Sequence, residues 1–225
     1  MSHANNMDHF DSVTLIGKYV VLEPLRQSHL DGLVAAAEDG ELWNLWYTNV
    51  PRPEEMEEEI DRRLTLADKG SMLPFTARLF DSQTQAGGRI IGMTSYMNID
   101  LTLPRVEIGS TWNAASVHGT GTNPDSKMLL LDYAFSVLHC PAVEFRTHWM
   151  NQQSREAINR LGAKQDGILR SHTRAKDGSL RDTVVYSILA HEWPMIEAAL
   201  RQRLGKGAVT PSLNPAEHSG ARSLR

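Results

Sequence analysis

The residues best suited to chemistry form a turn rich in glycine and threonine that precedes an apolar helix. The turn reads His118-Gly119-Thr120-Gly121-Thr122-Asn123 and is followed by Pro124. Glycine allows positive φ and close approach of a ligand to the main chain, asparagine is a good N-cap, and proline fits the first helical position. Such a turn directs free backbone N–H groups and the positive end of the helix dipole toward one point. The sequence therefore predicts a phosphate-binding site at residues 119–123.

Glycine turns also occur in hairpins and helix caps, so the pattern does not identify a ligand by itself. The sequence contains no Gly-x-x-x-x-Gly-Lys followed by Ser or Thr, which excludes the P-loop. No third glycine follows Gly121 at the spacing of dinucleotide-binding folds. The segments around the turn must therefore decide what it binds.

Those segments predict a strand before the turn, a helix after it and then a second strand. Apolar and polar residues alternate in residues 106–112 and 143–149, as in half-buried strands. Residues 125–138 carry an apolar stripe at helical spacing. Because a helix connects the two strands, we expect them to be parallel neighbours in an otherwise mainly antiparallel sheet.

The next predicted helix begins with Asn151-Gln152-Gln153-Ser154 and ends at Leu161-Gly162. The order strand, Gly-x-Gly turn, helix, strand, Asn-x-x-Ser helix and Leu-Gly resembles the acetyl-CoA-binding core of the GNAT superfamily of N-acetyltransferases. The Asn-x-x-Ser motif and its flanking strands resemble the branch that contains the ribosomal-protein N-terminal acetyltransferases. The resemblance covers most of residues 15–204. It implies an α/β (α+β) fold with a mixed, mainly antiparallel sheet, a splayed central parallel pair of strands, and helices on both faces.

The resemblance also implies acetyl-CoA, or another short acyl-CoA, as the donor. Its pantetheine arm would lie in the gap between the parallel strands and bind the free strand edge, and its pyrophosphate would lie over the amides of the glycine turn. Asn151 and Ser154 match family positions that contact the pantetheine arm and the thioester, and Asn151 can also N-cap its helix with Ser154 at N3. The implied strand-edge residues are Gly109, Ser110, Thr111 and Trp112, and the implied turn residues are Gly119, Thr120, Gly121, Thr122 and Asn123.

Two further residues near the turn have alternative interpretations. Lys127, about one turn into the helix, is either a point charge for a phosphate or a solvated lysine. His118 either approaches a phosphate or is a loop histidine without a role.

The catalytic residues are less well marked than the donor site. The family's more common general acid is a tyrosine four residues before the Leu-Gly glycine, and this chain has Ile158 there. Ser154 is then the candidate that protonates or hydrogen bonds the leaving thiolate. Glu107 is the candidate general base, because it alternates with apolar residues on the first strand and burial would raise its pKa. The alternative for Glu107 is an ordinary salt-bridged or solvent-facing glutamate.

The segment at residues 41–50 carries three aromatic residues, Trp43, Trp46 and Tyr47. Clustered aromatic residues in a connection are often packing anchors, but in the family this segment borders the acceptor cleft. We expect an enzyme that transfers an acetyl group to a primary amine of a protein N-terminus, an amino acid or a small molecule, by direct attack in a ternary complex. A catalytically weak acyl-CoA sensor or interaction module is the alternative.

Composition sets further bounds. The 225 residues are 41% hydrophobic with a net charge of -4, which favours one globular domain and gives no general footprint for nucleic acid or a membrane surface. We expect a flexible N-terminus at 1–13, a transferase domain at 14–205 and a disordered tail at 206–225. The single Cys140 excludes an internal disulfide and fits a cytoplasmic protein, and the nine histidines form no metal-binding motif. The oligomeric state stays open, with a homodimer as one option.

Overall fold

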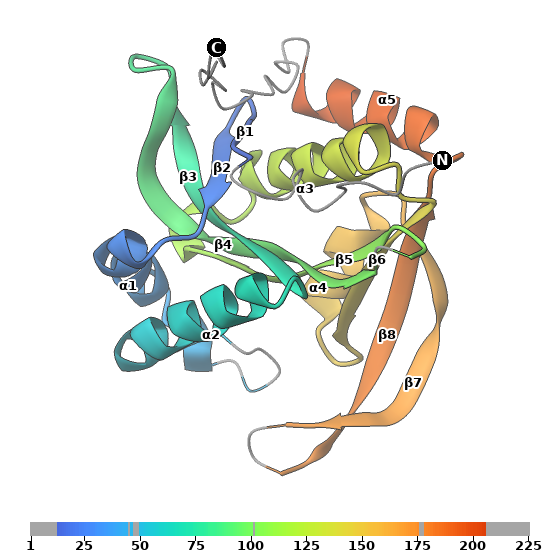
Figure 1. Cartoon of the computed structure of the whole chain (residues 1–225), viewed down its shortest axis with the longest axis horizontal. Helices are drawn as coiled ribbons and strands as arrows, with labels where there is room; N and C mark the ends of the chain where they lie inside the picture. The colour runs from blue at the N-terminus through green and yellow to red at the C-terminus, as the bar shows by residue number, and fades with distance from the viewer. Residues whose placement is uncertain (1–12, 45, 47–49, 101, 176–177, 206–225) are drawn as a thin grey trace, which may run out of the picture.

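The computed structural model describes residues 13–44, 46, 50–100, 102–175 and 178–205, which form one eight-stranded sheet with helices on both faces (Figure 1). The strand order is β1-β2-β3-β4-β5-β6-β8-β7, and every neighbouring pair is antiparallel except β5 and β6. The strands are β1 (Leu15–Ile16), β2 (Val20–Pro24), β3 (Met72–Asp81), β4 (Ala86–Asp100), β5 (Arg105–Asn113), β6 (Ala142–His148), β7 (Lys164–Arg174) and β8 (Leu180–Leu189). The helices are α1 (Leu30–Glu38), α2 (Met56–Asp68), α3 (Thr122–Asp132), α4 (Gln152–Asn159) and α5 (Trp193–Leu204).

Helices α1 and α2 cover one face of the sheet, and α3 and α5 cover the other (Figure 1). Two neighbouring residues of β4 show this arrangement, because successive side chains of a strand point to opposite faces. The Ser95 hydroxyl accepts a hydrogen bond from Arg63 of α2, whereas the Thr94 hydroxyl accepts one from Lys127 of α3. Among the described residues, no helix has the length and apolar composition needed to cross a bilayer.

The parallel strands β5 and β6 are paired over only three residues. Arg105, Val106 and Glu107 face Ala142, Val143 and Glu144 in register. Beyond Glu107 the two strands part: β5 continues to Asn113 along β4, and β6 continues to His148 along β8. The predicted mixed sheet with a splayed parallel pair is confirmed.

Helix α3 is buried on nearly all sides because it lies between the sheet and α5 (Figure 1). Its buried residues include polar ones in the first half, Thr122, Asp125, Ser126 and Lys127, and apolar ones from Met128 to Leu131. The sequence predicted a start at Asp125, after an Asn123 N-cap, but the helix begins at Thr122 and its N-cap is Gly121. The predicted α-helix to Leu138 also changes at Tyr133–Val137 into a π-helical turn, in which the Leu138 amide donates to the Tyr133 carbonyl oxygen.

Candidate active site

The glycine turn presents backbone amides to solvent at the start of α3. Gly119 has φ +73°, and the Gly119 and Gly121 amides donate to no carbonyl oxygen among the described residues. The Asn123 amide lies in the first helical turn, where N–H groups have no intrahelical acceptor at i−4. The Thr120 hydroxyl closes the turn from inside by donating to the Val117 carbonyl oxygen at 2.7 Å. The turn therefore has the donors that an anion requires.

Gly121 does not have the positive φ that its turn position suggested, while its part in binding a phosphate stays a prediction. Its φ is −74°, so it does not need the left-handed region, and the expectation of positive φ was wrong for this residue. A Cβ atom placed on Gly121 would lie 2.5 Å from the Tyr19 ring. The lack of a side chain at Gly121 therefore allows Tyr19 to pack closely on the turn.

Asp125 fixes the N-terminus of α3 to the edge of the sheet. Its fully buried carboxylate accepts hydrogen bonds from the backbone amides of Tyr19 at 2.7 Å and Val20 at 3.2 Å. Burial raises the pKa of the Asp125 carboxyl, and these amide donors oppose the rise. The contact sets the direction in which the first turn of α3 points.

A bulge in β5 follows Glu107 and is pinned by a buried arginine. The pairing of β4 with β5 shifts register between Met93 and Ser95, and opposite this shift Ser110 has φ +48°. Arg63 of α2 is only 2% exposed and donates to the Ser110 carbonyl oxygen at 3.1 Å and to the Ser95 hydroxyl at 3.1 Å. Glu59, one turn earlier in α2, binds the same guanidinium group at 2.7 Å. The helix thereby holds the peptide planes at the bulge.

Glu107 is buried, with 6% of its surface exposed, on the face of the sheet covered by α1 and α2. Its Oε2 atom accepts a hydrogen bond from Asn98 at 2.7 Å and lies 3.5 Å from Arg146 Nε. Burial raises the pKa of the Glu107 carboxyl, and the Arg146 charge and the Asn98 hydrogen bond oppose that rise. The Oε1 atom would lie 3.0 Å from a Cβ on Gly109, so this glycine keeps the space beside it open.

The aromatic segment between α1 and α2 reaches the same face through Trp46. The Trp46 ring is 60% exposed and packs edge-on against His148, at the end of β6, with ring centroids 5.2 Å apart. Trp43 packs against the core, as a packing anchor would, and Tyr47 lies outside the described residues. Trp46 thus stays a candidate for the acceptor wall.

Lys127 lies inside the protein, with 7% of its surface exposed, which rules out a solvated lysine. Its Nζ atom donates to the Thr111 hydroxyl at 2.7 Å and the Thr94 hydroxyl at 3.3 Å. Burial lowers the pKa of the Lys127 ammonium group to about 7. This position joins α3 to the predicted donor strand and does not favour a direct phosphate contact.

Asn151 is the N-cap of α4, as the sequence predicted. Its Oδ1 atom accepts a hydrogen bond from the Ser154 amide at 2.9 Å, and the Ser154 side chain is half-buried. His118 is exposed and its Nε2 atom lies 2.9 Å from the Asn113 carbonyl oxygen, so the ring braces the turn. The roles of Asn151, Ser154 and His118 toward a donor stay predictions.

Several polar residues of the site were missed by sequence reasoning. Arg63 lies on the buried face of α2, seven residues after Met56. Because arginine is charged, the hydrophobic pattern of the sequence did not mark this position as buried. Arg146 and His148 are the polar positions of a strand that alternates, and their shared face with Glu107 follows once the parallel pairing is known. The pairing register was the missing information.

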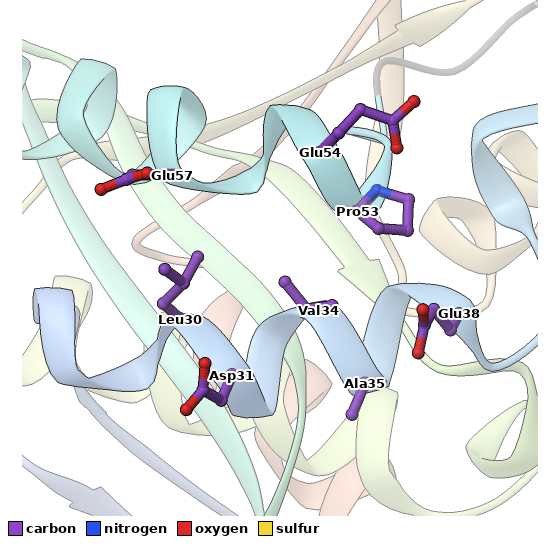
Figure 2. Close-up of a pocket in the computed structure, with 8 residues that line it drawn as sticks. All are labelled: Leu30, Asp31, Val34, Ala35, Glu38, Pro53, Glu54 and Glu57. Carbon is purple, nitrogen blue, oxygen red and sulfur yellow. The ribbon is translucent and has the colours of Figure 1, made fainter.

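A separate groove of about 440 Å³ lies between α1 and α2 and contains none of the predicted site residues (Figure 2). Leu30 and Val34 of α1 point toward α2 across it, and its rim carries carboxylates (Figure 2). The lining residues are Leu30, Asp31, Val34, Ala35, Glu38, Pro53, Glu54 and Glu57. Within the described part of the chain, no group of three His, Cys, Asp or Glu side chains could hold a metal ion.

Known proteins share this sequence pattern and fold. A family model described as an acetyltransferase (GNAT) domain matches residues 20–164. The chain is 30% identical over 105 residues to "Uncharacterized N-acetyltransferase p20" of Bacillus licheniformis and 32% identical over 106 residues to "Putative ribosomal N-acetyltransferase YdaF" of Bacillus subtilis strain 168. These matches span 46% and 47% of this chain but little more than half, 57%, of each relative.

The fold agrees with the sequence match. The crystal structure of a GCN5-related N-acetyltransferase from Brucella melitensis superposes with a TM-score of 0.72 at 29% identity and covers 86% of both chains. The predicted resemblance is confirmed: this chain belongs to the GNAT family of acetyltransferases.

Proposed function

We propose that this protein transfers the acetyl group of acetyl-CoA to a primary amine by direct attack in a ternary complex. The family uses acetyl-CoA as its donor. The observation that supports the proposal most is the position of Glu107, which is the last residue of β5 paired with β6. A buried carboxylate with a raised pKa therefore lies at the point where the gap between the strands opens. Residues 14–205 would form the single transferase domain.

The residues present fit the donor at both of its ends. The unpaired amides at Gly119, Gly121 and Asn123 would hold the pyrophosphate, aided by the dipole of α3. Within the described part of the chain, the edge of β5 from Gly109 to Trp112 has no partner strand on the β6 side. The amide groups of a pantetheine arm would bind this edge as an added strand would. Asn151 and Ser154, at the start of α4, would contact the thioester end.

Acyl transfer to an amine requires removal of a proton from the amine and protonation of the leaving sulfur. Acetyl-CoA supplies the electrophilic thioester carbonyl when bound. Glu107 accepts the amine proton, directly or through a water, as the new C–N bond forms and the C–S bond breaks. The Ser154 hydroxyl donates a hydrogen bond or a proton to the departing sulfur. Asn98 and Arg146 bind one oxygen of Glu107 and leave the other for the proton.

A catalytically weak acyl-CoA sensor is the second candidate, and one observation favours it. Ile158 stands where the family's common tyrosine would, and its side chain is buried in the core, so α4 has no phenol at that position. The two candidates differ only in turnover, since both retain the donor site.

A thiol-release assay with acetyl-CoA and a panel of peptide N-termini, amino acids and small amines separates the two candidates. We expect release with at least one class of amine and a loss of activity in Glu107→Gln. Binding of coenzyme A by calorimetry without turnover on any amine would establish the sensor. Thermal stabilisation by ATP or NAD in place of coenzyme A would exclude both.

A further inference from the structure

Arginine side chains gather around Glu107 on the face of the sheet that α1 and α2 cover. Arg146 on β6 lies opposite Val185 on β8, and Arg181 is four residues before Val185 on the same strand. Because side chains alternate along a strand, Arg181 and Arg146 point to the same face. The charge of Arg181 lowers the pKa of both Glu107 and His148, and Arg181 lies two residues along β8 from Thr183, the register partner of His148.

Arg181 differs from the other arginines of this cluster because it forms no ion pair with another described residue. Glu144 lies 2.5 Å from Arg105 and 2.9 Å from Arg146, and Glu107 lies 3.5 Å from Arg146. No carboxylate of the described residues lies within 4.0 Å of the Arg181 guanidinium, and its Nε atom is buried without a hydrogen-bond acceptor. Glu107 and Glu144 are thus paired with Arg105 and Arg146.

An unpaired donor on a partly buried guanidinium group is costly, and a carboxylate is the ligand that its planar fork binds best. On the opposite face of β8, its neighbour Asp182 binds Arg170 and the Ser171 amide. Burial also lowers the pKa of Arg181, while the charge of Glu107 raises it. Arg181 thus lies on the face of the sheet that carries Glu107 and His148, against which the exposed Trp46 packs.

We infer that the amine acceptor carries a carboxylate close to its amino group. Arg181 binds this carboxylate while Glu107 accepts the proton of the amine. The inference rests on the proposed function and names the substrate class of the same site. The shared chemistry fits two sources: the carboxylate of a free amino acid, or an acidic side chain directly after the first residue of a peptide.

The test compares matched acceptors that differ only in charge. One pair is a free amino acid and its amide, and the other is a peptide with Asp at its second position and the same peptide with Asn. We expect kcat/KM to be about 10- to 100-fold higher for the charged member of at least one pair. The pair that shows the difference identifies the source. Equal values in both pairs would overturn the inference.

The variant Arg181→Gln should remove this preference, so that kcat/KM for the charged member of each pair falls to within about twofold of the value for its neutral member in the same variant. Arg170→Gln is the matched control, because Arg170 is an exposed arginine of the same hairpin that pairs with Asp182. A uniform loss with charged and neutral acceptors would show that Arg181 is structural, and would also overturn the inference. If Arg181→Gln does not fold, Arg181→Lys and the acceptor pairs on the parent still decide.

A binding measurement separates failure of the inference from failure of the proposed function. Calorimetry of the Asp and Asn peptides, and of the amino acid and its amide, on the protein saturated with coenzyme A does not require turnover. Tighter binding of a charged member that is lost in Arg181→Gln, without thiol release from any amine, would retain the carboxylate site and reject the transferase. Thiol release with no charge preference would retain the transferase and reject the carboxylate site.

Discussion

The Arg63 guanidinium group donates a hydrogen bond to the Ser110 carbonyl oxygen across 3.1 Å, and Ser110 has the left-handed φ of +48°. The bond joins the middle of α2 to the bulge in β5, three residues beyond Glu107, the last residue of β5 paired with β6. Few residues other than glycine adopt such a φ without compensation. The buried arginine supplies that compensation and sets the direction of the neighbouring amides.

Replacing Arg63 should therefore disturb the donor site from a distance. We expect Arg63→Met to lower the free energy of unfolding by about 3 kcal/mol, because it leaves buried acceptors unpaired. We also expect kcat/KM for acetyl-CoA to fall about 10- to 100-fold through misplacement of the strand edge. Chemical denaturation and steady-state kinetics measure the two effects.

Arg62→Met is the matched control for Arg63→Met, since both arginines bind Glu59 but Arg62 is half exposed. It should cost less than about 1 kcal/mol and leave the kinetics nearly unchanged. Similar losses in both variants would show that the contact with Glu59, and not the contact with Ser110, matters.

Glu107→Gln should abolish most activity while preserving the fold. General-base catalysis contributes about 10²- to 10⁴-fold, and glutamine can still accept the hydrogen bond from Asn98. Burial raises the pKa of Glu107 above that of an ordinary glutamate, so the activity of the parent should rise with pH as Glu107 loses its proton. A variant that retains the parent's rate and pH profile would exclude Glu107 as the base.

The same substitution has a predicted effect on stability. The raised pKa means that the folded state holds the Glu107 proton more tightly than the unfolded state, so the stabilising contribution is fully present below the unfolded pKa. It is lost as pH rises through the folded pKa. Urea denaturation from pH 4 to pH 8 should therefore show Glu107→Gln gaining on the parent as pH rises, and a constant difference would contradict the burial effect.

Lys127 should produce a pH dependence in the alkaline range. Its folded pKa of about 7 lies below that of an unfolded lysine, so its contribution to stability is present above the unfolded pKa and is lost as pH falls through the folded pKa. Relative to Lys127→Met, the parent should gain up to about 1.4 kcal/mol per pH unit between the two pKa values. Chemical denaturation at pH 6 to 9 measures this gain, and the exposed Lys69→Met should show none.

The two glycines of the turn should respond differently to alanine. Gly121→Ala should cost about 1–3 kcal/mol because the new methyl group meets the Tyr19 ring, and Tyr19→Leu in the same chain should recover part of that loss. Gly119→Ala should cost about 1 kcal/mol through its φ of +73°, with no rescue by Tyr19→Leu, since no atom of the described residues lies within 4 Å of the added one. Thermal denaturation of the single and double variants distinguishes strain from collision.

Sequence pattern was sufficient for the fold because each element carried its own local signal. The alternation around Glu107, the turn at Gly119 and the cap at Asn151 all depend on residues close together in the chain. Contacts between distant residues were less accessible. The Arg63–Ser110 bond spans 47 residues, and the burial of Lys127 depends on the packing of α3 between the sheet and α5. The sequence around a charged residue does not show that a distant carbonyl or hydroxyl group will accept a hydrogen bond from it.

The start of α3 shows a similar limit. Asn123 and Pro124 both fit a helix start, but the side chain of Thr120 accepts from the Thr122 amide at 3.3 Å and the helix begins earlier. Gly121 was assigned to a backbone requirement, whereas the requirement comes from the Tyr19 ring 102 positions earlier in the chain. Local preference identified the turn but not the partner that shapes it.

The two halves of the sheet, β1 to β5 and β6 to β8, share a seam of only three residue pairs. A ligand whose amide groups bridge the opening below this seam would lengthen it and become part of the sheet itself. Bound coenzyme A would then hold the two halves of the sheet together. Amide hydrogens of β5 beyond Glu107 would exchange slowly when coenzyme A is present and rapidly when it is absent. Because the donor would join the two halves of the sheet, we expect it to bind before the acceptor.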